Sequence, residues 1–600
     1  MPITFSDIQN HWAKAPIIEL AQRSLISGYP DGSFRPDATI TRAEFAALLR
    51  KAFPNVPPIR NAITFTDVPA THWAAQAIAT AYRIGFLSGY PDATFKPNQS
   101  LERVQAFVAL ANGLKYSAPA NPTAIVQKYF DDAAKIPNYG IIPIAAAVQN
   151  RLVVNYPNIR QLKPLQNTTR GEVAAFISQA LKISNAVEPQ YIVGVFEIEP
   201  QFVQASNFFN GLAQVSINNK IGFIDKTGKL VTPKLFDDVG PRAEGLQPVS
   251  LGSKGGYIDT TAKLVIPAQF DGVDPFSEGL AVVKVGEKFG YIDKTGKFVS
   301  QPQFDLASSF TKNQELARVW INNKIGCVDK TGKIVIQPQF QEMEDFSDGL
   351  ARVKIDDKFA FIDTTGKVVI QPEFSGVERF SEGLTPIVVD YKYGYIDKTG
   401  NVVIQPKFEL AGLFSEGLAM IRLGNKSGFI DKTGNVVIQP QFDWAQSFSK
   451  GRAQVTVNGK LGVIDKTGTF VIQPQFEIIE AFSEGLARVL VPEQGVGYID
   501  ETGKVVIQPQ FGGVSIFPGD GNKYVSLQGD GIFSDGFAAV SVNNKWGYID
   551  KTGKVVIPPQ FDAAFAFSEG LARVNIGGQW SPLSTPPYLE GGKWGYISKP

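Results

Sequence analysis

The sequence predicts a multidomain fold in two parts: an all-α unit of three similar modules, then an all-β tandem array of three-stranded meanders. Two observations predict it. One set of helical motifs occurs three times within the first 185 residues, about sixty residues apart. A different motif then recurs from about residue 195 to the C-terminus, mostly every 34 to 36 residues. A chain of 600 residues also exceeds what one hydrophobic core normally serves.

The predicted boundaries follow the motifs. We expect helical modules at 1–60, 61–120 and 121–185, a linker at 186–194, and about eleven β-units over 195–600.

Each helical module is expected to hold two helices joined by a turn-rich loop. In the first module, apolar residues keep helical spacing over 17–25, and Gly28 ends the helix. The second helix begins at Thr41 and Glu44, which have the spacing of a capping box, and the third module repeats this pattern at 169–172. Such a cap contributes about 0.5–2 kcal/mol.

One arginine occupies the same position in all three modules, as Arg42, Arg103 and Arg170. A cation in the first turn of a helix opposes the helix dipole, so capping does not explain it. A guanidinium at a positive helix end is suited to a carboxylate or a phosphate. We therefore expect an anion-binding role, with a structural salt bridge as the alternative.

The motif set resembles the S-layer homology (SLH) family. The first copy reads Phe5-Ser-Asp7, His11-Trp12, Gly28-Tyr-Pro-Asp31-Gly32 and Thr41-Arg-Ala-Glu44. The second reads Phe65-Thr-Asp67, His72-Trp73, Gly89-Tyr-Pro-Asp92 and Leu101-Glu-Arg-Val-Gln105. The third is degenerate, with Tyr139 in the tryptophan position and with Asn155 and Asn158 in place of glycine and aspartate.

The resemblance implies a helical unit that binds cell-wall-linked polysaccharide, with an acidic, often pyruvylated, sugar held between modules. It implies two sets of sugar-binding residues, and a third module that keeps the motif arginine alone. The sets are Arg42, Trp12, Gly28 and Asp31, then Arg103, Trp73, Gly89 and Asp92, with Arg170 remaining. An indole stacks on a sugar face and a guanidinium grips a carboxylate. The alternative is that the tryptophans are core residues, and we expect two working grooves.

Each β-unit is expected to hold three short strands, as at 419–423, 428–430 and 436–438. The Asp-Lys-Thr-Gly segments predict turns braced by the aspartate. The glycine within the middle strand, such as Gly428, indicates close approach of a neighbouring group. A recurring phenylalanine is expected to fill the joints between successive sheets. Its copies are Phe276, Phe346, Phe380, Phe414, Phe448 and Phe482.

The array resembles the WG repeat family, whose Trp-Gly pair occurs here at Trp546-Gly547 and Trp594-Gly595. That resemblance implies architecture and no activity. The strand-like segment 198–202 lacks a unit, and the last unit lacks its third strand, which would allow a propeller-like ring. Because eleven blades exceed the usual four to eight, we favour an open, curved stack. Insertions at 512–530 and 576–592 are expected to form an irregular binding surface.

Composition and motifs argue against several classes of function. A net charge of +1 gives no support to nucleic-acid binding, and no apolar stretch is long enough to span a membrane. The only histidines are His11 and His72, and the single Cys327 is expected to be a small buried hydrophobe. We therefore expect no catalytic residues, no metal site and no cofactor.

The predicted function is that of a non-enzymatic, cell-surface adaptor. The helical unit would bind acidic wall polysaccharide, and the β-repeats would face a protein or glycan partner. No charged-then-apolar leader precedes the first motif, which leaves open an intracellular repeat scaffold with a relic SLH unit. A wall-anchored glycan-processing enzyme is the third alternative.

Overall fold

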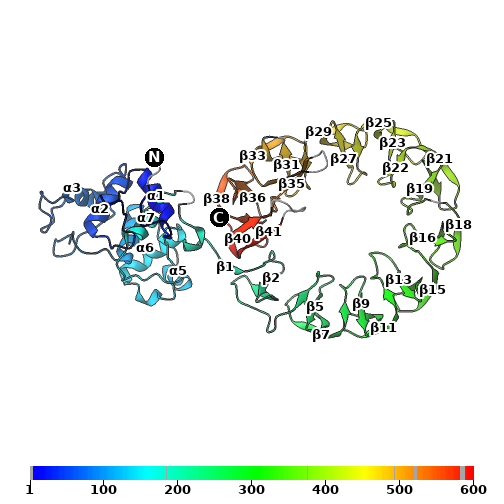
Figure 1. Cartoon of the computed structure of the whole chain (residues 1–600), viewed down its shortest axis with the longest axis horizontal. Helices are drawn as coiled ribbons and strands as arrows, with labels where there is room; N and C mark the ends of the chain where they lie inside the picture. The colour runs from blue at the N-terminus through cyan, green and yellow to red at the C-terminus, as the bar shows by residue number, and fades with distance from the viewer. Residues whose placement is uncertain (1–3, 184–185, 375, 492, 519–522, 582–587) are drawn as a thin grey trace.

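The computed structural model describes residues 4–183, 186–374, 376–491, 493–518, 523–581 and 588–600. It consists of a helical unit followed by a ring of small antiparallel sheets (Figure 1). The predicted change from α to β near residue 195 is therefore confirmed. The helices are α1 (Lys14–Gln22), α2 (Arg42–Ala52), α3 (Ala75–Arg83), α4 (Arg103–Gly113), α5 (Pro122–Tyr129), α6 (Asn138–Gln149) and α7 (Arg170–Ala180), with 3-10 turns at Ala133–Lys135 and Pro189–Tyr191.

The three modules interlock in a cycle. The start of the second helix of each module donates backbone hydrogen bonds to the loop of the next module, and the third module donates to the first. The pairs are Ala43 with Pro97, Val104 with Pro164, and Gly171 with Pro36. Both predicted capping boxes are present, at Thr41 and Thr169. The modules therefore share one core and one set of junctions.

Within the described residues, eleven sheets form the repeat units, numbered here in chain order. Units 1 to 6 are β2 (Leu212–Ile217) and β3 (Lys220–Asp225); β4 (Asp238–Val239), β5 (Gln247–Leu251), β6 (Lys254–Ile258) and β7 (Leu264–Phe270); β8 (Gly272–Val273), β9 (Leu280–Val285), β10 (Lys288–Asp293) and β11 (Phe298–Phe304); β12 (Leu306–Ala307), β13 (Leu316–Ile321), β14 (Lys324–Asp329) and β15 (Ile334–Phe340); β16 (Ala351–Ile355), β17 (Lys358–Ile362) and β18 (Val368–Phe374); β19 (Leu384–Val389), β20 (Lys392–Asp397) and β21 (Val402–Phe408).

Units 7 to 11 continue the pattern, and the last sheet also takes in β1. They are β22 (Leu410–Ala411), β23 (Ala419–Leu423), β24 (Lys426–Ile430) and β25 (Val436–Phe442); β26 (Trp444–Ala445), β27 (Arg452–Val457), β28 (Lys460–Asp465) and β29 (Phe470–Phe476); β30 (Ile478–Ile479), β31 (Leu486–Val491), β32 (Gly495–Asp500) and β33 (Val505–Phe511); β36 (Phe537–Val542), β37 (Lys545–Asp550) and β38 (Val555–Phe561); β39 (Ala563–Ala564), β40 (Leu571–Trp580) and β41 (Leu589–Ser598) with β1 (Ile198–Phe202). The inserted hairpin β34 (Val514–Pro518) and β35 (Lys523–Leu527) follows unit 9.

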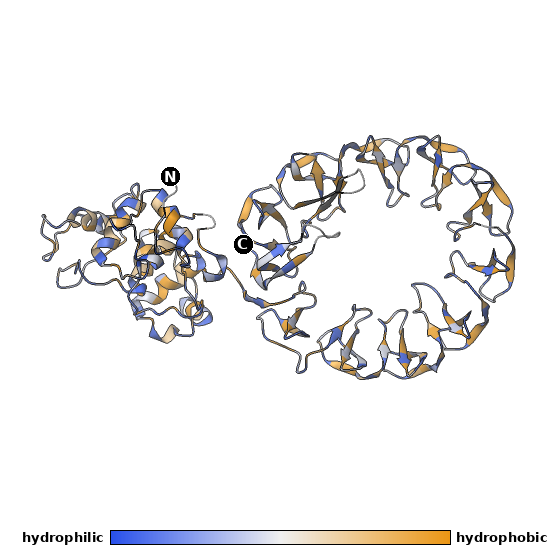
Figure 2. Cartoon of the chain, in the orientation of Figure 1, coloured by the Kyte–Doolittle hydropathy of each residue, from blue (hydrophilic) through white to orange (hydrophobic). Residues whose placement is uncertain are grey.

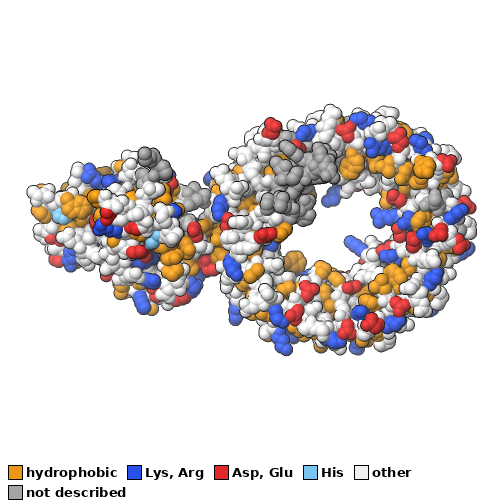
Figure 3. All heavy atoms as spheres, viewed as in Figure 1, with side chains coloured by type: hydrophobic (Ala, Val, Ile, Leu, Met, Phe, Trp, Pro, Cys, Tyr) orange, Lys and Arg blue, Asp and Glu red, His pale blue; other side chains and the backbone are white. Residues whose placement is uncertain are grey.

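The ring is closed, so the preference for an open stack was wrong. Strand β1 pairs antiparallel with β41, bringing Ile198 opposite Tyr596 and Phe202 opposite Trp594. The first strand after the helical unit thus completes the last sheet. Units 11 and 1 also share a hydrophobic cluster, and a space-filling view shows an opening enclosed by the ring (Figure 3). The ring thus exceeds the usual eight blades, and its eleven units enclose a wide opening.

Repeated contacts hold each unit together. The turn aspartates brace their turns as predicted: Asp293 accepts hydrogen bonds from Thr295 and from the backbone of Lys297. The strand glycine is crowded as predicted, since a Cβ on Gly290 would lie 2.6 Å from the carbonyl oxygen of Ser300. Hydrophobic residues follow the strands of the units (Figure 2).

The predicted joint phenylalanines are confirmed at four positions and are not fully buried at two. Phe276 packs its ring 4.9 Å from that of Tyr257 in the preceding unit. The other three buried copies are Phe380, Phe414 and Phe448. Phe346 is only half-buried, and Phe482 is 38% exposed. Cys327 is buried as predicted, and burial raises the pKa of its thiol to about 12.

The helical unit packs directly on the ring. Val187, Ile192 and Val193, from the segment predicted as a linker, are buried in a cluster that also includes Trp546 and Phe561. The two parts therefore share a continuous apolar contact.

Candidate functional site

Each motif arginine contacts the loop of a neighbouring module rather than that of its own. Arg42 donates to the carbonyl of Ser88, beside Gly89, whereas Arg170 donates to the carbonyl of Ser27, beside Gly28. The residue sets expected from the sequence are therefore assembled differently in the structure. The reason is the cyclic interlocking of the modules, which places the second helix of one module on the loop of the next.

Two of the three arginines are buried by protein partners. Arg103 is 2% exposed, donates to the carbonyls of Leu162 and Val154, and forms an ion pair with Glu172. Arg42 is also buried, and its Nε donates to the carbonyl of Phe95 at 2.8 Å. Burial lowers the pKa of both guanidinium groups. Their main contacts thus hold the module junctions together.

Arg170 is the accessible member of the set. It donates to the carbonyls of Phe34 and Ser27, at 3.0 and 3.2 Å, and its guanidinium lies 5.0 Å from the centre of the Tyr29 ring. Its Nη1 has no hydrogen-bond partner among the residues that the structure describes. The equivalent nitrogen of Arg103 is held by Glu172. Arg170 therefore retains a donor for a ligand.

An exposed indole stands over the same place. Trp73 is 65% exposed and lines, together with Arg170, Ser27 and Lys51, a groove of about 160 Å³. We call this groove A. It combines residues of all three modules, with an apolar floor that includes Phe34 and Leu48. An aromatic face beside a cation suits a ring-shaped anionic ligand.

The pseudo-equivalent places differ from groove A. We call the place beside Trp12 groove C and the place beside Tyr139 groove B. In groove C, Trp12 stacks on Tyr156 at 4.9 Å with nearly parallel rings, so one face of the indole is already covered. In groove B, Tyr139 takes the tryptophan position, is 55% exposed, and lies within electrostatic range of Tyr90 and Arg42. Groove C is therefore closed, and groove B has a smaller aromatic and a buried arginine.

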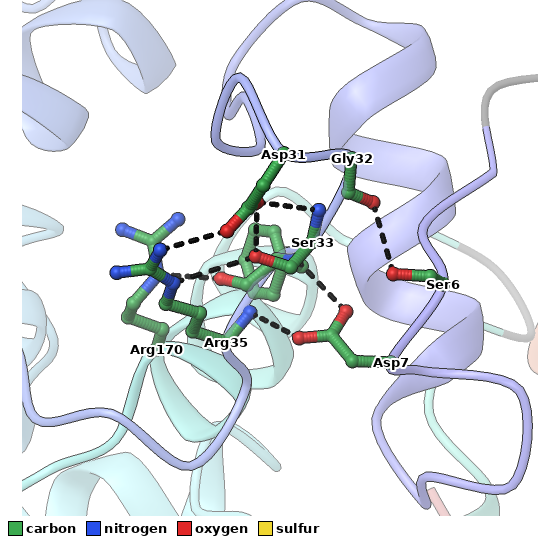
Figure 4. A network of polar contacts seen from close by, with 8 residues as sticks. Ser6, Asp7, Asp31, Gly32, Ser33, Arg35 and Arg170 are labelled. Carbon is green, nitrogen blue, oxygen red and sulfur yellow. Dashed lines mark hydrogen bonds and ion pairs between the residues drawn. The ribbon is translucent and has the colours of Figure 1, made fainter.

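The loop glycines and aspartates have structural reasons of their own. A Cβ on Gly28 would lie 2.4 Å from the Phe5 ring, and one on Gly89 would lie 2.2 Å from the Phe65 ring. Asp31 accepts hydrogen bonds from Ser33 and pairs with Arg35 at 2.8 Å, which lowers the pKa of its carboxyl (Figure 4). Asp92 braces the second loop in the same manner through Thr94.

Several residues of the site were missed in the sequence. Arg35 lies 4.0 Å above the Tyr29 ring, so two guanidinium groups flank one aromatic ring beside groove A. Asp7 holds the same loop by accepting from the backbone of Phe34 and Arg35 (Figure 4). The sequence motif around Tyr29 pointed to this aromatic side chain, but nothing in the motif indicated that Arg35 and Arg170 lie beside it.

The insertion loops are only partly described. Trp580 packs against Trp546 with ring centroids 6.2 Å apart, and its indole N–H donates to the carbonyl of Asp562. That tryptophan is a packing residue. Residues 519–522 and 582–587 of the expected irregular surface lie outside the described residues.

Among the described residues, no helix is long and apolar enough to cross a membrane. Within the same residues, no group of three or more His, Cys, Asp or Glu side chains could hold a metal ion.

The interlocked helical unit with its groove, packed on a closed ring of repeated sheets, defines a two-part, repeat-built protein. The model for the WG containing repeat matches twelve segments between residues 194 and 580, and the model for the S-layer homology domain matches 4–46 and 64–107. The chain belongs to the WG containing repeat family, and its N-terminal part carries S-layer homology domains. The SLH matches fall within the first two modules.

Curated relatives are similar over a short part of their own length. A cellulosome-anchoring protein of Acetivibrio thermocellus is 40% identical over 126 residues, which are 20% of this chain and 27% of that protein. Cell surface glycoprotein 1 of the same organism is 33% identical over 168 residues, 27% of this chain and 7% of that protein. An amylopullulanase of Thermoanaerobacterium thermosulfurigenes is 30% identical over 184 residues, 31% and 10% of the two chains.

A solved structure, BamB from Moraxella catarrhalis, aligns with 44% of this chain and 94% of its own at 10% identity and a TM-score of 0.24. A similarity at this level carries no argument about the fold. Relatives named for anchoring and for cell surfaces share the SLH part of this chain.

Proposed function

We propose that this protein is a non-enzymatic cell-surface anchor and adaptor. Its helical unit binds an acidic, often pyruvylated, cell-wall polysaccharide without a covalent bond. The ring presents a broad surface to a protein or glycan partner. The observation that supports the anchoring role is groove A, which is lined by both the exposed Trp73 and Arg170.

The chemistry of groove A suits an acidic sugar. The flat indole of Trp73 packs on the apolar face of a pyranose, and Arg170 donates to the carboxylate. Lys51 adds a second cation on the groove wall. A hydrogen bond to a charged group contributes about 1.5–3 kcal/mol, so loss of the contact made by Arg170 or by Lys51 weakens binding by one to two orders of magnitude.

The three grooves are unequal under this proposal. Groove A binds most strongly, groove B contributes weakly through Tyr139 and Arg42, and groove C is occupied by its own Trp12–Tyr156 stack. Two sites on one rigid unit gain affinity for a long polymer by effective concentration. The expectation of two working grooves therefore becomes a proposal of one strong and one weak groove.

A pull-down on purified cell-wall sacculi tests the anchoring role. Full-length protein should sediment with native sacculi and remain in solution when the attached polysaccharide has been chemically removed. Trp73→Ala and Arg170→Ala should each lose retention, whereas Tyr391→Ala, which removes a 94% exposed aromatic from the ring, should not. Equal sedimentation with native and stripped sacculi would refute the polysaccharide role.

The closed groove C favours one competing function, an intracellular repeat scaffold with a relic SLH unit. A groove filled by Tyr156 no longer serves a ligand, as expected of a decaying site. Cell fractionation distinguishes the two. Native protein in the wall fraction supports the anchor, and native protein confined to the cytoplasm supports the scaffold.

A further inference from the structure

Four units carry an arginine at the third position of a Leu-Ala-Arg segment, within the strand that precedes the Asp-Lys-Thr-Gly hairpin strand. They are Arg318, Arg352, Arg488 and Arg573. Three of them point across a joint and donate to a backbone carbonyl of the next unit, at Met343, Val377 and Ala205. Arg488 donates to the carbonyl of Gln528, in the insertion that precedes the next unit. A half-buried guanidinium is thus a recurring element of the ring.

Three of the four arginines are neutralised by a carboxylate drawn from two positions in the repeat. Arg318 pairs at 2.8 Å with Asp345, which immediately precedes the joint phenylalanine of the next unit. Arg488 pairs at 2.7 Å with Glu480, two residues before the joint phenylalanine of its own unit. Arg352 pairs with its own-unit acid in the same way. Each buried positive charge therefore has a fixed counter-charge.

Arg573 is the exception, because both positions hold a neutral residue. Asn207 stands where Asp345 stands at the other joint, and Phe565 stands where Glu480 stands. The guanidinium instead lies 3.9 Å above the Phe565 ring. Arg573 forms no ion pair within the described ranges, and Asp530 acts on it only at longer range. Burial lowers the pKa of Arg573, as expected of a cation without a partner.

A polar cavity opens beside this arginine at the closing joint, between unit 11 and unit 1. It has a volume of about 420 Å³, is partly open to solvent, and is lined by Gln204, Ser206, Gln214, Ser216 and Trp594 together with Arg573. No acidic side chain lines it. The side chains of Gln204, Gln214 and Ser216 make no hydrogen bonds to the described part of the chain. The cavity, here the closing pocket, thus combines one cation with free neutral donors and acceptors.

We propose that the closing pocket binds a sugar residue carrying one carboxylate, of the uronic-acid class. The carboxylate takes the place of the missing acid at Arg573, and the amide and hydroxyl groups of the lining receive the sugar hydroxyls. A pocket for a bare anion would not need the neutral hydrogen-bonding wall, and a pocket for a neutral sugar would not need the unpaired arginine. The site lies on the ring and is separate from groove A.

Calorimetric titration with D-glucuronate tests the pocket, with D-glucose and acetate as matched probes that lack the charge or the ring. The full-length protein carries Trp73→Ala and Arg170→Ala so that groove A does not contribute. Glucuronate should bind at least about tenfold more tightly than either probe. Arg573→Gln should remove that preference, and Arg352→Gln, which alters the equivalent arginine of unit 5, should leave it intact.

A second variant keeps the test independent of folding defects. Asn207→Asp supplies the carboxylate that Asp345 supplies at the other joint, so it should abolish glucuronate binding while preserving or raising the thermal midpoint. The proposal is overturned if glucuronate binds no better than glucose or acetate, or if its binding survives Arg573→Gln and Asn207→Asp. Loss of sacculus retention by the groove A variants is scored separately, so the two proposals fail independently.

Discussion

The three motif arginines should separate into structural and ligand-binding members when each is removed. Arg103→Ala deletes a buried guanidinium and leaves Glu172, whose side chain is 15% exposed, without its counter-charge. It also frees the carbonyls of Leu162 and Val154. Breaking one side of a buried ion pair costs about 3–5 kcal/mol. Arg170→Ala removes two bonds from a half-buried group, which costs about 1–3 kcal/mol.

Urea unfolding followed by near-ultraviolet circular dichroism measures the stability difference, and sacculus sedimentation well below the unfolding transition measures retention. Arg103→Ala should show the large stability loss with near-normal retention of the folded fraction. Arg170→Ala should show the reverse. If Arg103→Ala unfolds like the parent protein but detaches from the wall, its guanidinium contacts the ligand, and the assignment of groove A is refuted.

Three further predictions concern the ring and its connection. Ile198→Ala and Ile404→Ala should each lower the free energy of unfolding by about 2–5 kcal/mol. Only Ile198→Ala should free β1 from β41 and expose the following segment to protease. Equal protection of the two variants from protease would contradict closure of the ring by β1. Burial raises the pKa of Glu199 to about 7, above its ordinary 4.5, so the stability of the protein should fall as pH rises between these values. Above pH 7, the Glu199→Gln variant should be more stable than the parent protein by up to about 3 kcal/mol in urea titrations. A stability difference that does not change with pH would argue against burial of this carboxyl. Glu569→Lys should destabilise the closing joint, and Lys226→Glu should partly restore its stability. A double-mutant cycle should give a coupling energy of about 0.5–1 kcal/mol, and zero coupling would mean that this ion pair does not stabilise the joint.

Local chemistry in this protein was predictable because it depends on neighbours in the sequence. The capping box at Thr41 and Glu44 joins residues three apart, and the turn aspartates act over two to four residues. The crowding at the strand glycine was also predictable, because it recurs with every unit. In each case the interacting groups travel together along the chain.

The assembly of the grooves was not predictable in the same way. The partner of Arg170 is Ser27, 143 residues away, because the third module closes a cycle onto the first. The motif spacing within one module contains no information on that exchange. The closure of groove C depends likewise on Tyr156 reaching Trp12 from another module. Contacts between residues far apart in the sequence therefore determine which loop each arginine contacts.

The closure of the ring, by contrast, could have been predicted from the charged residues of the repeats, although eleven units are more than a propeller usually has. The acid of each Ser-Glu-Gly turn pairs with the lysine of the next unit's Asp-Lys-Thr-Gly turn, as Glu416 does with Lys466 at 3.2 Å. Where a unit has no acid in its first turn, the next unit has no lysine in its Asp-Lys-Thr-Gly turn. Where a unit has a lysine in place of the acid, the next unit has an acid in place of the lysine. These exceptions are Asn210 with Thr260, Asn313 with Thr364, and Lys450 with Glu501.

Such coupled replacements imply that each pair is maintained as a contact. In an open stack, Lys226 of the first unit would have no preceding acid, and Glu569 of the last unit would have no following lysine. Both residues are nevertheless present, and they pair with each other at 3.1 Å across the closing joint. Glu569 also accepts the backbone N–H of Gly211, as Glu416 accepts that of Gly451. The closing joint therefore carries the same chemistry as the interior joints, and the terminal units of this chain are built to be neighbours.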